Sequence, residues 1–111
     1  MADRPFTPST FREAVLRALG LQTNLRANVP VPMSDVVAAV VGETGFMPGE
    51  HGEISGGKDA VEWAIGRAYF LAKRDEHIAP PKMKRGMWGL SEQGVTLART
   101  LLLGTDTDTV I

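Results

Sequence analysis

Apolar residues recur every three or four positions in three stretches of the chain, and this spacing predicts three amphipathic helices. The first begins with Thr7, whose side chain suits an N-cap, followed by Pro8 at the first helical position. Gly20 is typical of a helix stop and is expected to end this helix. The last of the three follows Ser91, its expected N-cap, and runs to about Leu103.

The strongest pattern opens at Asp59 and gives a helix with two distinct faces. One face is expected to be buried and carries Val61, Ala64, Ile65, Ala68, Tyr69 and Ala72. The other face carries Trp63, Arg67, Phe70 and Arg74. Large aromatic residues are mostly buried, so Trp63, Phe70 and Trp88 are expected in the core. The alternative for Trp63 and Phe70 is an interface between two copies of the chain.

An apolar run at residues 36–41 follows Ser34, a reasonable N-cap, and predicts a short helix buried on all sides. The segment 42–57 then holds six glycines, one proline and three acids. This is the composition of a loop, which is either mobile or ordered by a partner.

Three short strands complete the predicted elements, at residues 29–31, 77–79 and 87–90. The last two flank a turn with three bases and no acid, at residues 80–86. The order of helix, strand, two helices, basic hairpin and last helix is that of a winged helix. We therefore expect a mostly helical α+β fold, a winged helix-turn-helix with a small antiparallel β-hairpin wing. Residues 1–104 form the predicted domain, and 105–111 a frayed tail.

A chain of 111 residues suffices for one domain, and 43% hydrophobic residues is ordinary globular composition. Cysteine is absent, which excludes disulfides and thiolate zinc sites. No apolar run is long enough to span a bilayer, so the expected location is the cytoplasm. The net charge is −1, but residues 58–85 carry seven bases against four acids, while 32–57 carry four acids and no base. A polyanion would be attracted to one face only.

Two segments carry a family likeness. Residues 61–64 and 69–73 resemble the third helix of the N-terminal winged-helix domain of Mrr-type restriction endonucleases. Residues 84–94, Lys-Arg-Gly-Met-Trp-Gly-Leu-Ser-Glu-Gln-Gly, resemble the wing of that domain, and the likeness extends loosely from Phe11 to Leu102. The resemblance implies DNA binding. The catalytic domain that follows in those endonucleases has no counterpart here, so the resemblance implies no cleavage by this chain.

Seven basic residues are the candidate DNA contacts. Those on the third helix, which would dock in the major groove, are Lys58, Arg67, Lys73 and Arg74. Those on the wing, which would lie along phosphates or in the minor groove, are Lys82, Lys84 and Arg85. The competing interpretation is a solvated turn and a solvent-facing helix whose charges pair locally.

No catalytic constellation, metal site or cofactor is expected. The segment from Gly52 to Lys58 matches the spacing of a phosphate-binding loop, but Asp59 stands where such a loop needs Ser or Thr. His51 and His77 are the two histidines, and neither has the spacing of a metal ligand set.

These features lead to one hypothesis and one rival. The first is a non-catalytic winged-helix protein that binds double-stranded DNA as a homodimer, as a small transcription regulator or as the targeting subunit of a larger, restriction-related system. It would be cytoplasmic and associated with the nucleoid. The rival is a protein–protein interaction module with the same fold, since fold alone does not choose between these uses.

Overall fold

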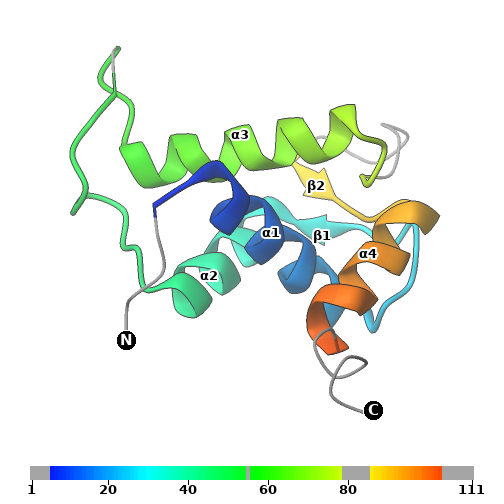
Figure 1. Ribbon diagram of the computed structural model, residues 1–111. Coiled ribbons are helices and arrows are strands. Elements are labelled where there is room, and N and C mark those ends of the chain that lie inside the picture. Colours follow the sequence, from blue (N-terminus) through cyan, green and yellow to red (C-terminus); the bar gives the residue numbers. More distant parts are fainter. Residues whose placement is uncertain (1–5, 55, 79–85, 104–111) are drawn as a thin grey trace.

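The computed structural model describes residues 6–54, 56–78 and 86–103. This part of the chain has four helices and a two-stranded antiparallel sheet, which confirms the predicted α+β, mostly helical class. The predicted tail, 105–111, lies outside the described residues. In chain order the elements are α1 (Pro8–Thr23), β1 (Val31–Pro32), α2 (Met33–Thr44), α3 (Ala60–Arg74), β2 (Met87–Trp88) and α4 (Glu92–Leu103) (Figure 1).

Helix α1 is the centre of the fold and packs against α2, α3 and α4. Its apolar stripe is fully buried, with no exposed surface at Phe11, Val15 or Leu19. The predicted start is confirmed, because Pro8 is the first helical residue and the Thr7 hydroxyl accepts a hydrogen bond from a backbone N–H in the first turn. The helix therefore begins where its capping signal lies and is held by burial on several sides.

The prediction that Gly20 ends this helix is wrong. α1 continues to Thr23, and Asn24 ends it in the left-handed conformation, with φ of 61°. Gly20 is instead a buried residue within the helix. A Cβ added there would lie 3.1 Å from side-chain atoms of Ala98 and Leu102. The glycine thus allows α4 to approach α1 closely.

The strands are shorter than the sequence predicts. β1 begins two residues later and ends one residue later than the predicted strand 29–31, and of the predicted strand 87–90 only the first two residues form β2. These two strands pair with each other in antiparallel orientation. Of the predicted strand 77–79, Ile78 forms a bridge with Leu90, and residue 79 lies outside the described residues. Proline in β1 lacks an N–H donor, which limits the ladder.

Helix α2 is confirmed, but Ser34 is not its N-cap. The helix begins at Met33, whose backbone N–H donates to the carbonyl of Gly86 at 2.8 Å. This bond satisfies one of the N–H groups that a helix start leaves open, and it ties α2 to the residue before β2. Val36 and Val40 are fully buried while the opposite side is exposed, so α2 is not buried on all sides.

The glycine-rich segment predicted at 42–57 begins later, because α2 extends to Thr44. Its own contacts hold it against the fold. Phe46 lies 5.5 Å from the ring of Phe11 and 5.2 Å from the ring of His51, measured between ring centroids. The expectation that this segment is mobile or ordered by a partner stays a prediction.

Helix α4 begins as predicted, since the Ser91 hydroxyl accepts from the backbone N–H of Gly94 at 3.0 Å. Gly94 lies directly against the carbonyl of His77, which leaves no room for a side chain.

Within 6–54, 56–78 and 86–103, no helix has the length and apolar character required to cross a membrane.

Candidate nucleic-acid interface

Helix α3 begins one residue after Asp59, where the sequence pattern opens, and the Asp59 side chain caps it. The Asp59 carboxylate accepts from the backbone N–H groups of Val61 and Glu62 at 2.9 and 3.0 Å. The bond from Glu62 is the main reason why the pKa of Asp59 lies below its usual value. From there one side of α3 enters the core, through Val61, Ala64, Ile65, Ala68 and Ala72. The opposite side faces outward along one edge of the molecule (Figure 1).

The four cations predicted for the third helix are all exposed, namely Lys58, Arg67, Lys73 and Arg74. They fall into two groups. Lys58, just before the helix, and Arg67 line one shallow hollow on the outer side of α3. Lys73 and Arg74 lie in the last turn, where a positive charge also suits the negative end of the helix dipole.

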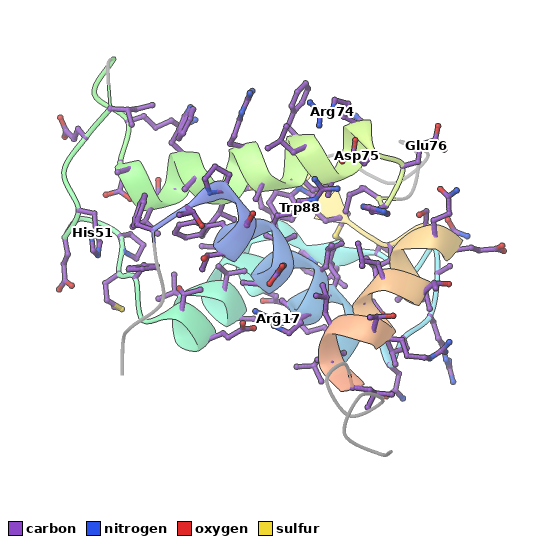
Figure 2. All side chains as sticks on the ribbon, viewed as in Figure 1. Arg17, His51, Arg74, Asp75, Glu76 and Trp88 are labelled. Atoms are coloured by element: carbon purple, nitrogen blue, oxygen red, sulfur yellow. The ribbon has the colours of Figure 1, made fainter. Side chains whose placement is uncertain are left out.

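The competing interpretation, local pairing of these charges, applies to one of the four. Arg74 donates to Asp75 at 3.3 Å, and the two residues lie together at the C-terminal end of α3 (Figure 2). Asp75 also accepts from Arg12 of α1 at 2.6 Å, and this bond is the first cause of its lowered pKa. Asp75 therefore keeps a cationic partner if Arg74 turns to another anion.

The three cations of the predicted wing, Lys82, Lys84 and Arg85, lie outside the described residues. The residues on either side of that segment are fixed. Ile78 is buried and bridges to Leu90, and Gly86 accepts the hydrogen bond from the start of α2. The chain therefore leaves and re-enters the described fold beside the strand pair.

The aromatic residues of α3 differ from the expectation of a core position. Trp63 and Phe70 are 44% and 55% exposed, on the same outer side as Arg67. Only Trp88 is buried as predicted, stacked on Tyr69 with ring centroids 4.1 Å apart. Burial also raises the pKa of the Tyr69 hydroxyl. The core position beneath α3 is thus taken by the Tyr69 and Trp88 pair.

Between the two exposed aromatic residues lies a hollow of about 400 Å³. Its lining consists of Lys58, Glu62, Trp63, Gly66, Arg67 and Phe70. The Arg67 guanidinium carbon lies 5.7 Å from the centre of the Phe70 ring, within cation–π distance. The sequence pattern placed Trp63, Arg67 and Phe70 on one face, but it gave no sign of a hollow there.

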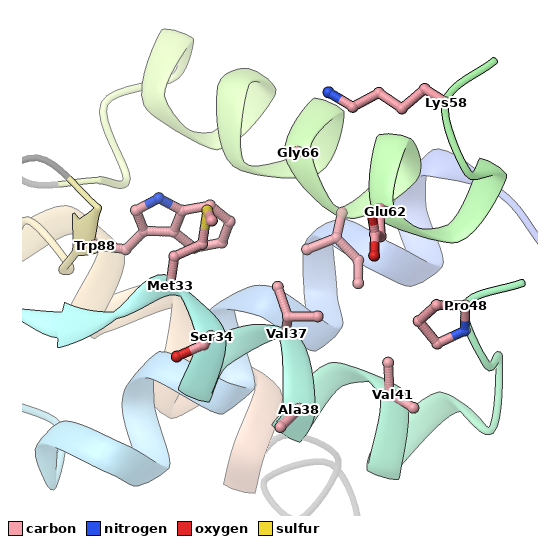
Figure 3. A pocket seen from close by; sticks show the side chains of 11 residues that line it. Met33, Ser34, Val37, Ala38, Val41, Pro48, Lys58, Glu62, Gly66 and Trp88 are labelled. Carbon is pink, nitrogen blue, oxygen red and sulfur yellow. The ribbon is translucent and has the colours of Figure 1, made fainter.

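A second hollow, of about 600 Å³, opens between α2 and α3. Figure 3 shows Met33 and Trp88 at one end and Val41 and Pro48 at the other, with the Glu62 carboxylate directed toward it. Its lining is mainly apolar and comes from both helices, the glycine-rich segment and β2. Sequence reasoning missed this site because its residues are spread over four separate segments.

The other residues weighed as candidate sites, Asp59, His51 and His77, make contacts within the fold. The carboxylate of Asp59 occupies N–H groups at the α3 start that a phosphate would need. His51 lies among aromatic rings, and the Nδ1 atom of His77 is 3.1 Å from the Arg12 guanidinium. Among the described side chains, no three His, Cys, Asp or Glu residues form a group that could hold a metal ion.

Comparison with protein-family models, with curated proteins and with solved structures found no match to this chain.

Proposed function

We propose that this protein is a non-catalytic DNA-binding protein of winged-helix organisation. The observation that carries the proposal is the exposure of all four predicted cations on and just before α3, a helix whose other side is anchored in the core. A rigid helix with an outward cationic side can lie in the major groove, where arginine reads guanine edges and both arginine and lysine contact phosphates. The likeness to the Mrr-type winged-helix domain remains a prediction that agrees with this proposal.

The order of the elements supports the winged-helix part of the proposal. α2 and α3 are consecutive helices, and the bridge from Ile78 to Leu90 joins the two segments expected to form the hairpin. In a winged helix the third helix enters the groove and the hairpin contacts the adjacent backbone. The basic residues 82–85 fall between the two strand positions, where a wing would be.

A single module of this size offers a limited footprint, on the order of 600–1,000 Å² for comparable domains. A homodimer would double that area, and we propose a homodimer on this ground. The expected roles are a small transcription regulator, or the DNA-targeting subunit of a restriction-related system that includes a larger protein. Both roles place the protein in the cytoplasm, at the nucleoid.

The test is fluorescence anisotropy of a labelled duplex, titrated with the full chain at about 50 and 200 mM salt. We expect micromolar binding that weakens steeply as salt rises, because cations that replace counterions give a slope of about −0.9 per phosphate contact. The double variant Arg67→Ala with Arg74→Ala should flatten the slope by roughly two units. Lys84→Ala with Arg85→Ala should do the same if the wing contacts phosphates.

Arg99→Ala is the matched control, because Arg99 is an exposed arginine on α4, away from this face. It should leave both affinity and slope unchanged. No binding at low salt would reject DNA as the ligand. An unchanged slope in both double variants would reject α3 and the basic segment as the contact surface.

The second candidate is a protein–protein interaction module, and the exposure of Trp63 and Phe70 favours it. Exposed aromatic side chains on one helix face are common at protein interfaces. The two functions separate in the same titration, since only DNA binding gives the steep salt dependence.

A further inference from the structure

The outer face of α3 keeps two aromatic side chains in contact with water. Burying a large apolar side chain stabilises a fold, so leaving Trp63 and Phe70 exposed forgoes part of that gain. They are seven residues apart, which puts them on the same side of the helix, about two turns from each other. They lie opposite the buried side of α3, so packing of the core does not account for these two side chains.

Gly66 lies between them and is also unexplained by packing. Glycine inside a helix is less favourable than alanine. A Cβ added at Gly66 would meet no atom within 4 Å, in contrast to Gly94, where it would lie 1.9 Å from the His77 carbonyl oxygen. Because Gly66 has no side chain, nothing projects from it into the hollow between Trp63 and Phe70.

The walls of this hollow suit a flat, partly polar group attached to a polyanion. The guanidinium of Arg67 already lies over the Phe70 ring, so that face accepts a planar group. Lys58 lies in the lining, and Lys73 and Arg74 lie in the last turn of α3, where phosphates on either side of the bound group would meet cations.

We propose that this slot, formed by Trp63, Gly66, Arg67 and Phe70, takes an unpaired nucleobase. The proposal rests on the nucleic-acid binding proposed above and specifies its substrate. Aromatic side chains stack on bases with about 1–3 kcal/mol per base. The protein should therefore favour DNA that carries an unpaired nucleotide over the same duplex fully paired.

A second copy of the chain is a poorer occupant for the same slot. Two α3 faces brought together would place Arg67 of each copy close to the crossing point. Both faces carry more cations than acids, so they would repel each other. A nucleic-acid strand supplies the opposite charge along the whole helix.

The test compares two labelled probes at one salt concentration, a paired duplex and the same duplex with one extra unpaired nucleotide. The wild-type chain should bind the second probe about 5- to 150-fold more tightly, the range that corresponds to stacking of one base. Gly66→Ala should remove most of this preference, because its methyl group would occupy the floor of the slot. Trp63→Ala should weaken the preference as well.

Gly42→Ala is the matched control, because Gly42 is also a helical glycine whose added Cβ would meet nothing within 4 Å. Both alanine variants should be more stable than wild type by urea unfolding, so lost preference in Gly66→Ala cannot come from misfolding. If wild type binds both probes equally, or if both alanine variants show the same preference, the slot does not take an unpaired base. The DNA-binding proposal would then still stand. Binding of neither probe would overturn both proposals. A dimer in gel filtration that Gly66→Ala dissociates would overturn the nucleobase assignment and give the slot to a second copy.

Discussion

Gly94 offers a sharp test of how α4 is held, because the structure leaves no space for even a methyl group there. A Cβ at this position would lie 1.9 Å from the carbonyl oxygen of His77 and 3.1 Å from a side-chain carbon of Leu90. To reach an ordinary contact distance, α4 or the His77 backbone must move by about 1.5 Å. The same carbonyl accepts the Ser91 backbone N–H at 3.1 Å, so this movement also disturbs the start of the helix.

The magnitude follows from three terms. Overpacking a tight site costs about 1–3 kcal/mol, and the loss of one hydrogen bond costs about 1 kcal/mol. Alanine in place of glycine within a helix returns about 1 kcal/mol. Gly94→Ala should therefore lower the free energy of unfolding by about 1–3 kcal/mol, with a fall in Tm of roughly 4–8 °C for each kcal/mol.

Urea unfolding followed by circular dichroism in the far ultraviolet measures this change. Gly42→Ala provides the comparison, since the same substitution in open space should raise stability. If Gly94→Ala is as stable as wild type, the close approach of α4 to His77 is not a constraint on the fold and the reasoning fails.

Two further outcomes concern charged groups. Burial, together with Arg12, lowers the pKa of His77 below its usual 6.5, so the neutral ring is favoured in the folded state. The resulting stability is fully present above about pH 6.5 and is lost as pH falls through the lower folded-state pKa. The urea midpoint of wild type should therefore decline between about pH 7 and 5, and it should decline less in His77→Gln. Parallel declines would contradict this assignment. Asp59→Ala should cost about 1 kcal/mol in urea unfolding through loss of the α3 cap, and Asp59→Asn should restore much of it. An alanine variant as stable as wild type would show that the cap is dispensable.

The parts of the fold that the sequence predicted correctly depend on neighbouring residues. Thr7 and Pro8 mark the start of α1, and Asp59 marks the start of α3, because a cap acts within its own turn. The buried stripe of α3 and the outward position of Arg67 follow from helical periodicity in the same way. The periodicity of the sequence was therefore enough to assign four of the seven candidate cations to one helix or to a position just before it. These four are Lys58, Arg67, Lys73 and Arg74.

The errors arise where a residue's role depends on a distant partner. Gly20 has the local chemistry of a helix stop, but it is required by contact with Ala98 and Leu102 of α4, which lie far along the chain. Trp63 and Phe70 are residue types common in cores, but they lie on the side of α3 opposite its buried residues and stay exposed. The hydrophobic pattern of the sequence alone does not show which of several apolar side chains will occupy the limited space of the core.

The central place of α1 has a consequence for how the chain folds. This helix leaves the ribosome before the other three helices, yet it packs against each of them, and its Arg12 pairs with a residue 63 positions further on. Contacts of such wide sequence separation form only after a large loop has closed, which slows folding. During synthesis the apolar stripe of α1 therefore lacks its partners, and the polypeptide is most exposed to chaperones and to aggregation before α4 has emerged.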